Sequence, residues 1–314
     1  MTAFLARWQT LPGNVRGAVY LTLTAILLSC GAFFIKRLGQ SLPSYEIILL
    51  RNLFVMALTL AFCFPRGRPS AFATDHLGLH LARGCLSFLS MSAFYWSYAN
   101  LPLAESTALM YTLPLFLIVL SVVFTGARVG WRRTLATTIG FTGVVVMLAP
   151  GMTSVEPLLL VPLSIGLTDA IITLVIKRLT ETESLASILL YMCLVSLFWS
   201  AVTVAVATFV FPDGLLGQLA AWRDPTPTEW TYAAGLACVS LLAQVFNVMG
   251  WRAGDPTAVA PASYSQIVFA GLVGFLVFGE TPEPWAALGA AIIIASTFYI
   301  VRREARLQRL KTIR

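Results

Sequence analysis

The chain has 314 residues and a formal net charge of +7, and only 11% of its residues are Asp, Glu, Lys or Arg. A soluble domain carries about 25% charged residues, so this composition excludes a soluble globular enzyme. Hydrophobic residues make up 58% of the chain, which indicates a membrane protein with room for roughly ten spans of about 20 residues each.

Ten charge-poor segments follow one another along the chain, and we interpret each as a transmembrane helix. Pro and Gly residues mark several of the breaks, as at residues 65–69, 150–151 and 212–214. The first segment lacks the features of a cleaved signal peptide, so we expect it to remain as the first span. The expected spans are residues 17–35, 47–64, 81–99, 106–125, 131–149, 157–176, 185–211, 231–251, 257–279 and 284–301.

Basic residues lie mainly on one side of this arrangement. Of the 21 Lys and Arg residues, 17 fall on the face that holds both termini, and six of these form a basic tail at 302–314. The other four are Lys36, Arg37, Arg51 and Arg223. Because cytoplasmic loops carry an excess of Lys and Arg, we expect both termini in the cytoplasm. The tail should lie against anionic lipid headgroups, and no nucleic-acid partner is expected.

An internal similarity divides the chain in two. The tetrapeptide Ile-Lys-Arg-Leu ends a span at residues 35–38 and again at 176–179, an offset of 141. Residues 126–128 correspond to residues 278–280 at an offset of 152. We therefore expect a cytoplasmic segment at 1–16, a first repeat at 17–150 and a second at 151–301. Five spans in each half make the second half enter the membrane in the opposite sense, which is the inverted-repeat plan of many secondary transporters.

Three local motifs lie on this plan. They are the Arg51-Asn52 pair at the start of the second span, Tyr98-Ala99-Asn100-Leu101 before the fourth, and Phe278-Gly279-Glu280-Thr281-Pro282 near the end. With these motifs, nearly the whole chain resembles the drug/metabolite transporter superfamily in its EamA-type branch, and is most similar to amino-acid exporters of the YddG kind. The resemblance implies a ten-helix inner-membrane carrier with a central cavity. The first half has Ala127-Arg128 where the family often has Gly-Glu.

Polar residues on two spans are candidates for a substrate cavity. At the offset of 152, Ser92 in the first repeat corresponds to Gln244 in the second, and Tyr95 corresponds to Asn247. Ser240, Gln244 and Asn247 recur at helical spacing and so share one face of the eighth span. This stripe either lines a substrate site or forms hydrogen bonds between helices. Tyr111 and Tyr264, near Pro114 and Pro261, are further cavity candidates, although the prolines are also compatible with simple kinks.

Two charged residues lie inside expected spans. Asp169 should face the interior of the bundle, with Thr173 and Arg51 as candidate partners, because a charge at the centre of a span costs about 2.5 to 3.5 kcal/mol. It either takes up a proton, holds a substrate ammonium group or forms a fixed structural pair. Arg51 either pairs with a carboxylate or binds a substrate carboxylate.

Motifs for enzyme chemistry are nearly absent from the sequence. It has no phosphate-binding glycine loop, no nucleophile elbow and no Cys and His set with metal spacing, so we expect no cofactor, no metal and no ATP site. The two histidines, His76 and His80, follow Asp75 and fit a solvated turn best, although a metal or acid-base role is the alternative. The five cysteines lie in apolar runs, so no disulfide framework is expected.

We therefore expect a monomeric secondary transporter that exports small amphipathic metabolites, amino acids first among them, across a bacterial inner membrane by alternating access. The alternatives are export of another solute class, such as nucleosides or drugs, a membrane-embedded enzyme that acts on lipid-linked substrates, and a non-catalytic receptor or scaffold.

Overall fold

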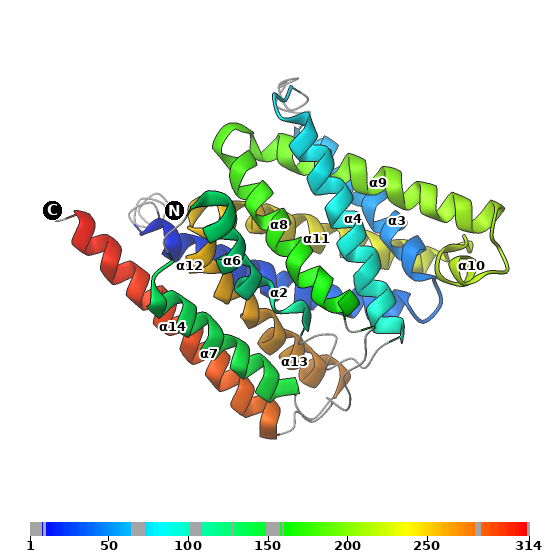
Figure 1. Cartoon of the computed structure of the whole chain (residues 1–314). Helices are drawn as coiled ribbons and strands as arrows, with labels where there is room; N and C mark the ends of the chain where they lie inside the picture. Colours follow the sequence, from blue (N-terminus) through cyan, green and yellow to red (C-terminus); the bar gives the residue numbers. More distant parts are fainter. Residues whose placement is uncertain are drawn as a thin grey trace.

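The computed structural model describes residues 11–63, 73–100, 109–126, 129–148, 160–279 and 284–312, together with Trp8 and Leu158. Within these ranges the chain forms helices joined by turns, without any strand (Figure 1). The first half contains α2 (Gly13–Leu38), α3 (Ser44–Cys63), α4 (Leu77–Asn100), α6 (Leu113–Thr125) and α7 (Trp131–Leu148). The second contains α8 (Leu160–Thr182), α9 (Leu185–Phe209), α10 (Leu215–Ala220), α11 (Pro227–Ala253), α12 (Pro256–Val259), the 3₁₀ turn η5 (Ala260–Tyr264), α13 (Ser265–Phe278) and α14 (Pro284–Thr312).

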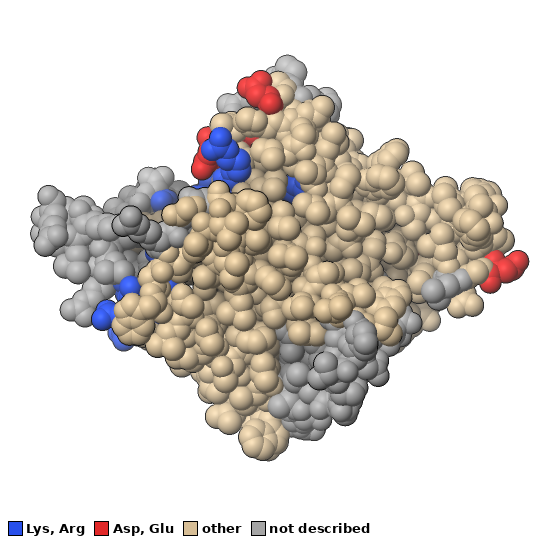
Figure 2. Space-filling view, viewed as in Figure 1, with Lys and Arg blue, Asp and Glu red and all other residues tan. Residues whose placement is uncertain are grey.

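Seven of the helical segments in the described ranges are long and apolar enough to cross a membrane. They correspond to seven of the ten expected spans, namely those in α2, α3, α4, α8, α9, α11 and the run from α12 to α13. The other three expected spans fall on α6, α7 and α14. α6 has 13 residues, and the apolar part of α14 is limited to Ala287–Tyr299. On the face shown in Figure 2, a broad surface of uncharged side chains separates the charged groups at its edges.

Local signals explain where several helices begin and end. Thr226 caps α11, and Glu229 bonds back to it in a capping box. Ser184 caps α9 with its side chain, which accepts a hydrogen bond from the Ser187 amide. At the other ends, Gly126 after α6 and Gly279 after α13 adopt left-handed backbone angles, with φ of 62° and 69°. Only glycine takes this conformation without steric cost.

The packing of helices from the two halves follows a regular pattern. α2 packs on α11 and α13, while α8 packs on α4 and α6. α3 packs on α11, while α9 packs on α4. The remaining large contacts pair α3 with α9 and α7 with α14, which lie side by side in Figure 1. The helices of the two halves correspond in chain order, with α2, α3, α4, α6 and α7 matching α8, α9, α11, α13 and α14. If each helix is exchanged for its match, the same set of contacts results.

A polar network joins the ends of several helices around Asp255, between α11 and α12. The Asp255 carboxylate accepts hydrogen bonds from Thr257 and lies 3.2 Å from Arg133 Nη1 on α7. The Asp255 amide donates to Asn14 at the start of α2, at 2.8 Å. Lys177, at the end of α8, donates to the carbonyl of Gly254 at 2.9 Å. Lys177 therefore caps the end of α11 instead of lying free at the surface.

Replacement of Asp255 by Ala should lower the thermal stability of the protein. The change removes the cap of α12, worth about 1 kcal/mol, and a partly exposed ion pair worth at most about 1 kcal/mol. Asp255→Asn keeps the cap and loses only the ion pair, so its melting temperature should lie between those of the wild type and Asp255→Ala. Equal melting temperatures for wild type and Asp255→Ala would contradict the assignment.

The same carboxylate sets a pH dependence. Burial raises the pKa of Asp255, but hydrogen bonds from Thr257 and the charge of Arg133 outweigh burial and lower the pKa below its usual value. A lowered pKa stabilises the fold above the unfolded value of about 3.9, and this contribution is lost as the pH falls through the folded value. The difference in melting temperature between wild type and Asp255→Asn should therefore persist at neutral pH and shrink below about pH 4.

Candidate functional site

Asp169 lies near the middle of α8, nine residues after Leu160 and thirteen before Thr182. Its carboxylate accepts a hydrogen bond of 2.7 Å from Ser90 Oγ on α4. Within the described part of the chain Asp169 forms no ion pair, so the expected pairing with Arg51 is not observed. Thr173, the other expected partner, donates to the main-chain carbonyl of Asp169 at 2.8 Å and does not bind the carboxylate. Among the described residues, the side-chain partner of the Asp169 carboxylate is therefore the neutral Ser90.

The Asp169 side chain points to the interior of the bundle. Residues two positions apart on a helix point roughly 200° apart, and the exposed Leu167 is two positions before Asp169. The neighbours on the Asp169 side, Ile165 and Ala170, are buried. Asp169 is nevertheless only half-buried. The inward position keeps the Asp169 carboxylate away from lipid.

The polar stripe on α11 has the same orientation. Cys238 and Leu242 are exposed and mark the outward face of this helix. Ser240 and Gln244 are each two residues from Leu242, and Asn247 is nine residues from Cys238, so all three point to the opposite side. They too are half-buried there. Because α8 and α11 pack against each other, the Asp169 side and the polar stripe both belong to the interior of the bundle.

Arg51 lies deeper in the protein than expected, because α3 begins at Ser44. Its guanidinium donates to Asn52 Oδ1 at 3.0 Å and contacts Met91 Sδ at 3.5 Å. Asn52 in turn donates to Ser200 Oγ on α9 at 3.2 Å. Arg51 thus belongs to a buried polar network between α3, α4 and α9. Met91 is adjacent to Ser90, so this network and Asp169 approach the same point of α4 from two sides.

Two short segments, one before α13 and one before α6, interrupt the α-helical structure of the described residues. The run from α12 to α13 passes through the 3₁₀ turn η5, which contains Pro261 and ends at Tyr264. Tyr111 and Thr112 form a turn directly before α6, so Pro114 lies in the first turn of α6 and does not kink it. Interrupted helices leave main-chain groups available to a ligand, and transporters commonly bind their substrates at such points.

Close contacts join both interruptions to the long helices of the interior. The turn before α6 lies against Gly166 on α8, where a Cβ atom would overlap Thr112 Oγ1. Gly166 is one helical turn from Asp169, so this interruption is close to the acid. At the other interruption, Ser29 on α2 contacts the main-chain carbonyl of Gln266 at 3.3 Å.

The remaining cavity candidates have packing roles or lie outside the described side chains. Ser92 donates to the Phe88 carbonyl of its own helix at 2.9 Å. Tyr264 is fully buried, with its hydroxyl 3.5 Å from the Thr137 carbonyl. Tyr111 packs against the cluster formed by Tyr264, Val144, Ile267 and Ile293. The side chain of Tyr95 lies outside the described part of the structure, as do residues 127, 128 and 280.

The expectation of a solvated histidine turn is wrong for His80. This residue lies in the first turn of α4, is 1% exposed and stacks on Tyr191 of α9 with ring centroids 4.6 Å apart. Its Nε2 atom lies 3.9 Å from the buried carboxylate of Glu183. No group of His, Cys, Asp and Glu in the described residues has metal-binding geometry. His80 is packed between helices, whereas Asp75 remains exposed and His76 partly exposed.

Ser90 and Arg83 are buried polar residues that are not among the candidates predicted from the sequence. Ser90, the partner of Asp169, is two positions from Ser92 and so points to another side of α4. Arg83 is 2% exposed and donates to the Ile188 carbonyl on α9 at 2.9 Å. A charged residue at the third position of the segment 81–99 was the available signal for Arg83. The sequence gives no comparable signal for Ser90, since a serine in a span is compatible with any face.

The fold and these side chains define a class of protein. Long apolar helices fit a bilayer, polar side chains turn inward on α8 and α11, and short non-α segments precede α6 and α13. This combination is typical of multi-pass membrane carriers. The EamA-like transporter family matches residues 15–149 and 157–302, and the chain belongs to this family. It is a multi-pass protein of the bacterial inner membrane.

Several relatives cover nearly the same length. The S-adenosylmethionine uptake transporter of Rickettsia felis is 27% identical over 92% of this chain and 94% of its own. The riboflavin transporter of Vibrio cholerae is 27% identical over 85% and 86%, and the pseudopaline exporter CntI of Pseudomonas aeruginosa is 23% identical over 92% and 96%. A solved crystal structure superposes with a TM-score of 0.74 at 20% identity, over 93% of this chain and 98% of the other.

Proposed function

We propose that this protein is a secondary transporter that moves a small metabolite with a cationic group by alternating access, and that Asp169 holds that group. The observation that carries the proposal is the Asp169 carboxylate on the inward side of α8, which accepts a hydrogen bond from the neutral side chain of Ser90. An unpaired charge within a membrane bundle costs about 2.5 to 3.5 kcal/mol. A substrate cation next to the carboxylate offsets this cost, and the half-buried amides of Gln244 and Asn247 supply further hydrogen bonds.

The proposed mechanism rests on two five-helix repeats in opposite orientations, at 17–150 and 151–301. Four observations support it. The contacts between the halves map onto themselves, and the two Ile-Lys-Arg-Leu segments lie in the last two turns of α2 and α8. The family matches one segment in each half. The left-handed glycines Gly126 and Gly279 each follow a tyrosine, Tyr111 and Tyr264, by fifteen residues. Rocking of one repeat against the other then exposes the Asp169 region to each side in turn.

The relatives narrow the substrate class. They are named for S-adenosylmethionine, riboflavin and pseudopaline, and none of them is named for a standard amino acid. S-adenosylmethionine carries cationic groups that suit Asp169, whereas riboflavin carries none at neutral pH. We therefore place amphipathic metabolites with a cationic amino or sulfonium group first. Amino acids fall within this class, because their amino group carries the same positive charge. Amino-acid export is therefore a narrower form of the proposal.

Counterflow in proteoliposomes tests this function. Vesicles loaded with one unlabelled solute should take up the same labelled solute from outside, for S-adenosylmethionine or for a set of amino acids. Riboflavin serves as the comparison solute without a positive charge. If labelled riboflavin exchanges and no cationic solute does, the assignment of Asp169 is wrong. If no solute exchanges at all, the transporter proposal itself is contradicted.

The proposed orientation predicts which face of the membrane each loop reaches. The loop of residues 210–226 should lie outside the cell, and both termini should lie in the cytoplasm. Gly217 is a poor labelling site, because a Cβ atom there would overlap the Pro212 carbonyl. Gln218 is exposed, and a Gln218→Cys variant should react with an impermeant thiol reagent in intact cells. If the variant reacts only after permeabilisation, the orientation in the membrane is the reverse of the proposed one.

A further inference from the structure

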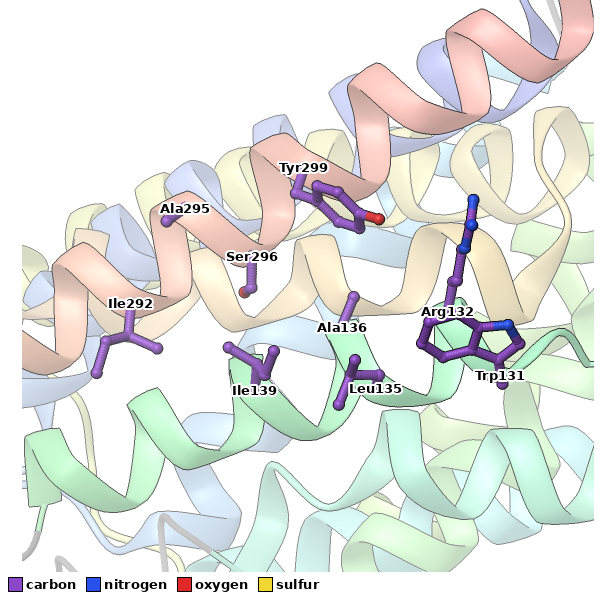
Figure 3. Close-up of a pocket in the computed structure, with 9 residues that line it drawn as sticks. All are labelled: Trp131, Arg132, Leu135, Ala136, Ile139, Ile292, Ala295, Ser296 and Tyr299. Carbon is purple, nitrogen blue, oxygen red and sulfur yellow. The ribbon is translucent and has the colours of Figure 1, made fainter.

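A groove of about 410 Å³ lies between α7 and α14, on the outside of the bundle (Figure 3). Its walls are apolar, and exposed side chains such as Leu135 and Ile139 border it. Trp131 and Arg132 stand at one end of the groove, next to Tyr299. The residues that line it are Trp131, Arg132, Leu135, Ala136, Ile139, Ile292, Ala295, Ser296 and Tyr299.

The way the two helices pack explains the groove. Toward the far end of α7 the backbones touch, since a Cβ atom on Gly143 would lie 3.0 Å from the Gly289 carbonyl of α14. Toward the start of α7 the small side chains of Ala136 and Ala295 leave the space between the helices unfilled. The groove is therefore closed near Ile139 and Ile292 and open near Trp131.

The size of the groove suits a single lipid chain. The nine residues from Trp131 to Ile139 span about 12 Å along the helix. One leaflet of a bilayer has a hydrocarbon thickness of about 15 Å, half of the usual 30 Å. An apolar groove that runs along two lipid-facing helices over this length matches one acyl chain that lies parallel to them.

Charge at the open end selects the headgroup. The guanidinium of Arg132 lies 5.3 Å from the centre of the Trp131 ring, and Arg132 has no carboxylate partner among the described residues. Its neighbour Arg133 points elsewhere and pairs with Asp255. Arg302, which stacks on Phe298 of α14, adds a second positive charge at the same end. Trp131 and Tyr299 have the amphipathic rings that gather at the level of lipid headgroups.

We propose that the groove between α7 and α14 binds an anionic phospholipid, with one acyl chain between Leu135 and Ile292 and the phosphate at Arg132. This lipid belongs to the leaflet at which α14 ends, which the proposed topology makes the cytoplasmic one. The site is separate from Asp169 and does not depend on which solute is transported. An immobilised chain at this position fills the gap between two helices that otherwise pack over only part of their length.

Native mass spectrometry of the delipidated protein with added phosphatidylglycerol or phosphatidylcholine tests the site. The wild type should retain phosphatidylglycerol about five-fold more strongly than phosphatidylcholine, the factor that corresponds to about 1 kcal/mol for one basic residue beside an anionic lipid. Arg132→Gln should remove this preference. Arg178→Gln, a change of an exposed arginine on α8 away from the groove, should keep it.

A second variant tests the contribution of the acyl chain independently of the headgroup. Ala295→Phe fills the groove from an exposed position and should reduce retention of both lipids. The proposal is overturned if Arg132→Gln and the wild type retain phosphatidylglycerol equally. It is also overturned if Ala295→Cys forms disulfide-linked dimers in membranes, because a second copy of the chain would then occupy the groove. Counterflow of the proposed solute should continue in Arg132→Gln, which separates this result from a failure of the transport proposal.

Discussion

Asp169→Asn should reduce counterflow of the cationic solute by about 30-fold, which corresponds to the loss of about 2 kcal/mol for a hydrogen bond to a charged group. The asparagine keeps the size of the side chain and still accepts a hydrogen bond from Ser90. Insertion and folding should therefore survive. Flux and counterflow are measured in proteoliposomes, and the melting temperature of the variant is measured beside them.

The pattern of loss distinguishes the roles open to Asp169. If both proton-driven flux and counterflow are lost, Asp169 binds the substrate. If proton-driven flux is lost and counterflow survives, Asp169 carries a proton during the cycle. Glu181→Gln is the matched control, because Glu181 lies on the same helix but is exposed and paired with Arg178. Unchanged flux and unchanged pH dependence in Asp169→Asn would leave the acid with a structural role only.

The second large effect should come from Gly166, where α8 lies against the turn before α6. A Cβ atom at this position would overlap Thr112 Oγ1 and lie 3.2 Å from the Leu109 carbonyl. Gly166→Leu should therefore force the two segments apart, lower stability by about 1 to 3 kcal/mol and disturb the site one turn away. Thermal unfolding in detergent and counterflow at a temperature below the transition measure the two effects separately.

Two further variants test the cause of this effect. Gly78→Leu makes the same change at a helical position with no atom within 4 Å of the added Cβ, and it should leave stability nearly unchanged. Gly166→Ala should be rescued in part by Thr112→Ala, which removes the hydroxyl that the new Cβ meets. If Gly166→Leu is as stable as Gly78→Leu, α8 and the turn before α6 are not in close contact.

Hydropathy was sufficient to predict the class of fold and seven of the spans, because lipid imposes the same demand on every spanning helix. The spans at α6, α7 and α14 are harder to predict from hydropathy, since their apolar runs are short or begin with charged residues such as Arg132 and Arg133. The inward orientation of Ser240, Gln244 and Asn247 was also predictable from helical spacing alone.

Partners across helices were not predictable in this way. Asp169 bonds to Ser90 and not to Arg51 or Thr173, because helix rotation and depth decide which side chains meet. The sequence alone does not reveal that His80 is buried, because its packing against Tyr191 of α9 joins residues far apart in sequence. The left-handed glycines Gly126 and Gly279 lie 153 residues apart, one residue more than the offset of 152 at which residues 126–128 correspond to residues 278–280.

The central claim is that substrate binds in the interior, between Asp169 and the polar stripe of α11. Cysteine protection tests it most directly: Asn247→Cys in a background without the five native cysteines is treated with a small hydrophilic thiol reagent. We expect this cysteine to react in membranes and the counterflow substrate to slow the reaction, while a cysteine at Gln218 reacts at the same rate with and without substrate. A cysteine at position 247 that does not react, or that reacts equally fast in saturating substrate, would contradict the site.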